Sequence, residues 1–103
     1  MTMSKTTYPP RKVIAVDVDE TLIIKGRLNT RLIEWIKGKK ADGYQVNLWS
    51  ARGSLYAWKV AEHHDVTHLF DSIHSKPGII VDDQGWLWIK FVKVIKSVGN
   101  IGV

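Results

Sequence analysis

Short apolar runs alternate along the chain with stretches in which apolar residues recur at helical spacing. Residues 12–17 (KVIAVD) and 44–49 (YQVNLW) are rich in β-branched or aromatic residues, which favours buried strands. Between these runs, apolar residues follow the three-to-four-residue spacing of one helix face, namely Leu28, Leu32, Trp35 and Ile36. Asn29 or Thr30 is a suitable N-cap for this helix. The pattern predicts a strand, a helix and a second strand, in that order.

A second helix is predicted after the loop that follows residue 49. Ser54 is its expected N-cap, and Leu55, Trp58 and Ala61 are expected on its apolar face. The helix should end near residues 63–65, while Gly38 or Gly43 should end the first helix.

The rest of the chain predicts further strands and one ambiguous segment. Residues 67–72 are expected to form a third strand and residues 78–81 a fourth, which ends in acid at Asp82 and Asp83. Lysines at every third position favour a helix over residues 87–97, although the β-branched content there favours a strand. Strands that alternate with helices predict an α/β fold with a mainly parallel, Rossmann-like sheet in a three-layer sandwich.

Composition narrows the class of protein. The 103 residues suffice for a single domain, residues 1–103, with residues 1–10 as a loose N-terminal arm. The absence of cysteine excludes disulfides, thiolate metal sites and cysteine nucleophiles. No apolar run reaches the roughly 18 to 20 residues of a membrane span, and no signal peptide is recognisable, so we expect no membrane partner and a cytoplasmic location. A net charge of +5 favours phosphate-rich partners such as nucleotides or nucleic acid.

The clearest chemical feature is the string DVDET, residues 17–21, directly after the first strand. Asp17 and Asp19 can converge on one site because the chain leaves the alternating strand at this point. Two adjacent carboxylates need a positive partner, and an oxygen-only ligand set suits Mg²⁺. The sequence therefore predicts a magnesium site at the end of this strand.

Three further positions make the chain resemble the haloacid-dehalogenase superfamily. DVDET is similar to its first motif, Ser50 after QVNLW to the second, Lys76 in HSKPG to the third, and Asp82-Asp83 after GIIV to the fourth. The motifs occur in the family's order over about two thirds of the chain. The resemblance implies a fold of that superfamily and a magnesium-dependent phosphatase.

The resemblance also implies a role for each of these residues. Asp17 would be the nucleophile that forms an aspartyl-phosphate, and Asp19 the general acid and base. Ser50 would hold a phosphate oxygen, and Lys76 would neutralise charge on the transferred phosphoryl group while holding Asp17 in place. The implied magnesium ligands are the Asp17 side chain, the Asp19 carbonyl and two carboxylates, Asp82 and Asp83.

Some nearby residues allow more than one interpretation. Arg52 can bind a second anionic group of the substrate, or it can simply face solvent. Glu20 stands where many members of the superfamily have glycine. A cluster of His63, His64, Asp65 and His68 could suggest a zinc site. Its histidines are better explained as helix-end residues, because adjacent residues on a helix point in different directions.

The chain leaves room only for a short flap over residues 22–28 and for no cap domain. An open site implies a large substrate or a neighbouring subunit of a homo-oligomer as its lid. The leading hypothesis is a phosphomonoester hydrolase acting on nucleotides or polynucleotide 3'-phosphate ends, since GYQVNLWSARG resembles polynucleotide phosphatase domains. The alternatives are a small-metabolite phosphatase completed by oligomerisation and a non-catalytic binding or regulatory module.

Overall fold

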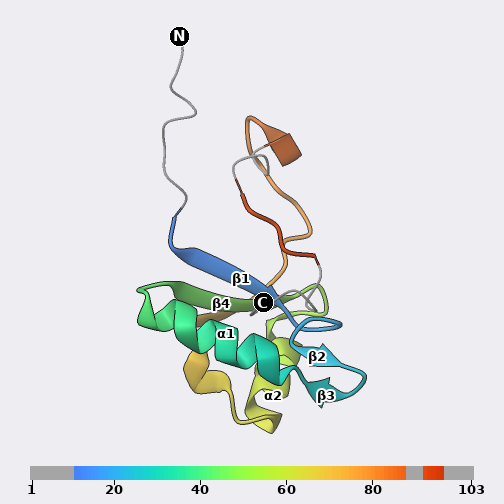
Figure 1. Cartoon of the computed structure of the whole chain (residues 1–103). Coiled ribbons are helices and arrows are strands. Elements are labelled where there is room, and N and C mark those ends of the chain that lie inside the picture. The colour runs from blue at the N-terminus through green and yellow to red at the C-terminus, as the bar shows by residue number, and fades with distance from the viewer. Residues whose placement is uncertain (1–10, 88–91, 97–103) are drawn as a thin grey trace.

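The computed structural model describes residues 11–87 and 92–96 (Figure 1). The predicted N-terminal arm and much of the helix predicted over residues 87–97 therefore lie outside the described residues. Within them, no helix is both long enough and apolar enough to cross a membrane.

The fold is α/β, as the sequence predicts. Strands β1 (Val13–Asp17), β4 (Gln45–Ser50) and β5 (Ser72–Ser75) form a parallel sheet in the order β1-β4-β5. Helix α1 (Thr30–Ala41) connects β1 to β4, and α2 (Ser54–His63) lies between β4 and β5 in the chain. Because both crossovers step in the same direction, right-handed connections place both helices on one face of the sheet, and both lie below the strands in Figure 1. The described residues thus form two layers, and the third layer of the predicted sandwich is not among them.

The hydrophobic core lies between the sheet and the helices. Along β4, Val46, Leu48 and Ser50 are buried, whereas the alternate residues are more exposed. In the paired strand β1, Val16 is buried beside Leu48, and Asp17 consequently points to the other face. The core is completed by residues from the helices and loops, namely Val18, Leu22, Leu32, Ile33, Ile36, Ala57, Ala61, Val66, Leu69 and Phe70.

The stretch predicted as a short flap forms an antiparallel hairpin of β2 (Ile23–Ile24) and β3 (Arg27–Leu28). Its turn residues, Lys25 and Gly26, have φ angles of 52° and 76°, as a two-residue hairpin turn of type I′ requires.

Helix α1 begins and ends at residues that the sequence indicates. The Asn29 side chain accepts a hydrogen bond from the Leu32 N–H at 3.2 Å, which confirms Asn29 as the N-cap. Asn29 also donates to the Thr21 carbonyl at 3.1 Å, so the cap fixes the start of the helix to the loop after β1. The helix ends at Ala41, and Gly43 follows with a φ of 90°, as expected for a helix-terminating glycine.

Two predictions for α2 are wrong. The N-cap is Gly53, with a φ of 104°, and Ser54 is the first helical residue, whose N–H donates to the Ser75 hydroxyl at 2.8 Å. Of the predicted apolar face, Ala61 is buried as expected, but Leu55 and Trp58 are exposed. The second buried residue of the helix is Ala57. Small alanine side chains let the helix backbone approach β4 and β5 closely, which hydrophobicity alone does not indicate.

The predicted third strand is also wrong in its position. Residues Thr67–Leu69 form a 3-10 helix that buries Leu69, and the strand starts later, at Ser72. The mostly polar sequence of β5 does not show the hydrophobic pattern of a strand. It forms a strand because its backbone pairs with that of β4.

Residues 78–81 are not a strand, in contrast to the prediction. They pair with no strand of the described residues, and Ile79 and Val81 are 85% and 96% exposed. Within the segment predicted as a C-terminal helix, residues 92–96 are not helical, which agrees with the low helix propensity of Val92, Val94 and Ile95.

Asp71 connects α1, β4 and the start of β5. Its carboxylate accepts from the Val46 N–H at 2.7 Å and pairs with Lys40 Nζ at 3.0 Å, while its own N–H donates to the Val46 carbonyl at 2.7 Å. The backbone hydrogen bond from Val46, followed by the Lys40 ammonium, lowers the pKa of Asp71 below its ordinary value.

Replacing Asp71 with alanine should lower the free energy of unfolding at neutral pH by about 1 kcal/mol, a modest value because the carboxylate is 42% exposed. Since the pKa is lowered in the folded state, this stabilisation is present above the ordinary aspartate pKa and is lost as the pH falls through the folded-state value. Urea denaturation of Asp71→Ala and of a control, Asp65→Asn, at neutral pH and near pH 3 measures it. A difference that persists unchanged in acid would contradict the assignment.

Candidate active site

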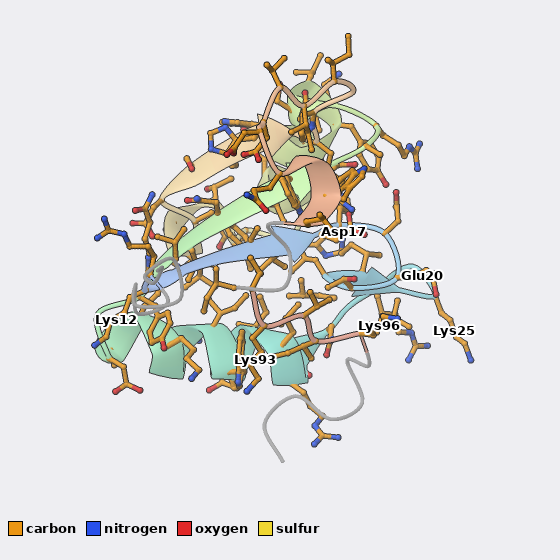
Figure 2. The ribbon with its side chains drawn as sticks, turned by 90° about the horizontal axis from the view of Figure 1, so that it is seen from above. Lys12, Asp17, Glu20, Lys25, Lys93 and Lys96 are labelled. Atoms are coloured by element: carbon orange, nitrogen blue, oxygen red, sulfur yellow. The ribbon has the colours of Figure 1, made fainter. Side chains whose placement is uncertain are left out.

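The carboxyl ends of the three parallel strands meet at one edge of the sheet. Asp17 is the last residue of β1, Ser50 is the last residue of β4, and Lys76 follows the last residue of β5. Figure 2 shows Asp17 at this end of β1, with Lys12 at the opposite end. Three of the sequence-predicted site residues therefore lie at one edge because the strands are parallel and adjacent.

Asp17 and Lys76 form an ion pair across the sheet. Lys76 Nζ lies 3.4 Å from Asp17 Oδ1, and each side chain is 36% exposed. The Lys76 N–H donates to the Ser50 carbonyl at 2.9 Å, which continues the β4–β5 pairing by one residue and fixes the lysine backbone. Its ammonium also lies 5.7 Å from the centre of the Trp49 ring. Lys76 can thus reach Asp17 from a fixed position two strands away.

The loop after β1 is a tight turn built from backbone hydrogen bonds. The Leu22 N–H donates to the Asp17 carbonyl, and the Ile23 N–H donates to the Val18 carbonyl at 3.0 Å. Glu20 adopts a φ of 59°, the left-handed region in which glycine is free of strain.

Asp19 is held by α2. The Tyr56 hydroxyl donates to Asp19 Oδ1 at 2.7 Å, and Arg52 Nη1 lies 3.7 Å from Asp19 Oδ2. Arg52 also donates to the Tyr56 oxygen at 3.1 Å, and its guanidinium carbon lies 3.9 Å from the centre of the Tyr56 ring. Asp19, Arg52 and Tyr56 are therefore one connected group at the rim of the site.

The neighbouring charged side chains, Asp19 and Arg52, change the pKa of Tyr56. The hydrogen bond to Asp19 raises the pKa of Tyr56 above its ordinary value, and burial and the charge of Asp19 act in the same direction. Arg52 opposes the shift in this pKa. Tyr56 thus remains a protonated donor to the carboxylate over the physiological pH range.

The sequence did not indicate Tyr56 as a site residue. The sequence gives no signal for it, because Arg52 precedes α2 and the four-residue spacing between Arg52 and Tyr56 is therefore not a helix-face pattern. Only the placement of α2 beside the loop after β1 reveals this contact.

Ser50 is 1% exposed, and its hydroxyl oxygen accepts a hydrogen bond from the Arg52 N–H at 3.0 Å. The hydroxyl therefore lies on the buried face of β4, opposite to the face of Asp17, and its oxygen shapes the turn between β4 and α2.

Asp82 and Asp83 do not join the other acids. Residues 77–87 rise away from the edge of the sheet (Figure 1), and the Asp82 carboxylate accepts from the Gln84 N–H at 2.7 Å in a local turn. Among the described residues, no group of three or more Asp, Glu, His or Cys side chains is placed to hold a metal ion. The oxygen-donor chemistry suits Mg²⁺, but this arrangement does not fit the complete ligand set of Asp17, Asp19, Asp82 and Asp83.

Comparison with known proteins gives one distant match. A protein of Arabidopsis thaliana named "Thiamine phosphate phosphatase-like protein" is 29% identical over 75 residues, which cover 73% of this chain and 30% of that protein. The chain thus spans less than one third of the relative's length. No protein-family model matches the chain, and no solved structure matches it.

Replacing the buried Ser50 with alanine removes the acceptor for the Arg52 N–H and should lower the free energy of unfolding by about 1 kcal/mol. The control is Ser54→Ala at the first, exposed position of α2, which should change it by less than about 0.5 kcal/mol. Urea denaturation of both variants measures the difference. Equal stability of the two variants would show that the Ser50 hydrogen bond contributes nothing to folding.

Proposed function

We propose that this protein is a phosphomonoester hydrolase that uses Asp17 as its nucleophile. The observation that carries the proposal is the Asp17–Lys76 ion pair at the carboxyl edge of the parallel sheet. The end of β4, with the Ser50 backbone, lies between the ends of β1 and β5 that carry these two residues. The Lys76 ammonium can attract an anionic phosphoryl group that the Asp17 carboxylate alone would repel. The name of the Arabidopsis relative supports phosphatase chemistry.

In the first step, an Asp17 carboxylate oxygen attacks phosphorus and the bond from phosphorus to the ester oxygen breaks. Protonated Asp19 gives its proton to the departing oxygen, so that an alcohol leaves and an aspartyl-phosphate remains. Lys76 lies beside the attacked phosphoryl group and stabilises the negative charge on its oxygens.

In the second step, water attacks the phosphorus of the aspartyl-phosphate. Asp19, now ionised, takes a proton from this water, and the bond between phosphorus and Asp17 breaks. Inorganic phosphate leaves, and both carboxyl groups return to their starting states. Each step needs Asp19 within hydrogen-bond reach of the reacting oxygen.

Magnesium belongs to the proposal as an activator. When bound, it would shield the phosphate charge from the Asp17 carboxylate. Asp17 and the backbone of Asp19 stand at the site, whereas Asp82 and Asp83 would have to approach from the segment that rises away from it.

The favoured substrates are nucleotides or the 3'-phosphate ends of polynucleotides. The net charge of +5 attracts such polyanions. The exposed Arg52, beside Asp19, can bind a second anionic group of the substrate. A small phosphorylated metabolite is the second candidate, favoured by the thiamine phosphate in the name of the relative.

The direct test is hydrolysis of p-nitrophenyl phosphate, a 3'-phosphorylated oligonucleotide and thiamine phosphate, with Mg²⁺, by the native protein and by Asp17→Asn. The variant should lose about three orders of magnitude or more in kcat, because an amide is a poor nucleophile. Circular dichroism should show that it remains folded. Turnover that survives in Asp17→Asn would exclude Asp17 as the nucleophile, and the best substrate of the panel would define the substrate class.

Magnesium binding is tested separately from activity. If Asp82 approaches the site, isothermal titration should show affinity for Mg²⁺ lowered roughly tenfold or more in both Asp17→Asn and Asp82→Asn. Asp65→Asn, which changes a carboxylate beyond the end of α2, should bind as the native protein does. An Asp82→Asn variant with unchanged affinity would remove Asp82 from the ligand set.

A further inference from the structure

Asp19 stands on an exposed loop, yet one of its oxygens has a fixed partner. Its side chain is 47% exposed, and such a carboxylate would ordinarily turn among several rotamers. The Tyr56 hydroxyl instead contacts Oδ1 at 2.7 Å, a short distance typical of a hydroxyl that donates to a charged oxygen.

Tyr56 is well suited to hold this position. It packs partly buried against the hydrophobic core, and its helix is fixed to the sheet by the buried Ala57 and Ala61. The Ser54 N–H bond to Ser75 on β5 further ties the first turn of the helix to the strand that leads to Lys76. The hydroxyl is therefore carried by a helix that packs against the core and is hydrogen-bonded to β5.

We infer that Tyr56 is a positioning residue for Asp19: it holds Oδ1 and leaves Oδ2 to exchange a proton with the leaving group and with water. The inference rests on the proposed function, because it assigns to Asp19 the acid and base role described above. Arg52 lies 3.7 Å from the free oxygen and is 63% exposed, so it can turn to an anionic substrate without releasing the hydrogen bond from Tyr56.

A positioning role predicts a dependence on the leaving group. An alkyl phosphate needs a proton on its departing oxygen, whereas p-nitrophenyl phosphate releases a stable phenolate and needs little acid assistance. Loss of the Tyr56 hydroxyl should therefore lower kcat/KM, which reports the step that forms the aspartyl-phosphate, for the first substrate and spare it for the second. Hydrolysis of the aspartyl-phosphate is common to both substrates and does not enter this comparison. A tyrosine that only supports the fold would affect both substrates equally.

The variant Tyr56→Phe keeps the ring beneath Arg52 and removes only the hydroxyl. We expect kcat/KM for an alkyl phosphate to fall roughly tenfold, a part of the about 10²–10⁴-fold that general acid–base catalysis supplies. For p-nitrophenyl phosphate the expected change in kcat/KM is less than about twofold. The control is Tyr44→Phe, at the opposite end of the sheet, where neither substrate should be affected.

Two further measurements separate the possible results. In an Asp19→Asn background, Tyr56→Phe should add no further loss, because its partner has already lost its function. In the metal-free protein, the ¹³C resonance of the Asp19 side-chain carboxyl should shift in Tyr56→Phe and not in Tyr44→Phe. Equal losses on both substrates, additive losses in the double variant or an unmoved resonance would overturn the inference while leaving Asp17 chemistry intact. Native protein without turnover would overturn the proposed function, and this inference with it.

Discussion

Parallel pairing on both sides of β4 is the constraint on which the site depends. The pairing aligns Asp17 with Trp49 and Ser50 with Ser75, so that the ends of three strands meet at one edge. Because successive side chains of a strand point to opposite faces, Val16 packs into the core whereas the neighbouring Asp17 faces away from the helices. A shift of one residue in this register would bury the carboxylate and expose the valine.

At this edge, each carboxylate is paired with a cation from another part of the chain. Asp17 comes from β1 and its cation, Lys76, from the end of β5, while Asp19 in the loop meets Arg52 and Tyr56 at α2. Neither carboxylate finds its partner in its own segment. The charged groups therefore come together only when the sheet and α2 have assembled, which links the proposed chemistry to the fold.

The sequence predicts the parts of this arrangement that depend on local pattern. The strand before Asp17 and the Asn29 cap follow from residue type, and parallel strand order is enough to bring Ser50 and Lys76 to the same edge. The buried face of α2 is not predictable in this way, because close packing favours small alanines over larger apolar residues. Residues 78–81 have a strand-like composition but no paired neighbour here, and Tyr56 becomes part of the site only through tertiary contact.

The central claim is that Asp17 attacks phosphorus, and the covalent product tests it most directly. The native protein would be mixed with a phosphomonoester and Mg²⁺, quenched in acid within a single turnover, digested and analysed by mass spectrometry. If Asp17 is the nucleophile, the peptide that contains Asp17 should carry one added phosphoryl group, which should be absent from Asp17→Asn. Turnover without any phosphorylated peptide, or with the group on another residue, would contradict it.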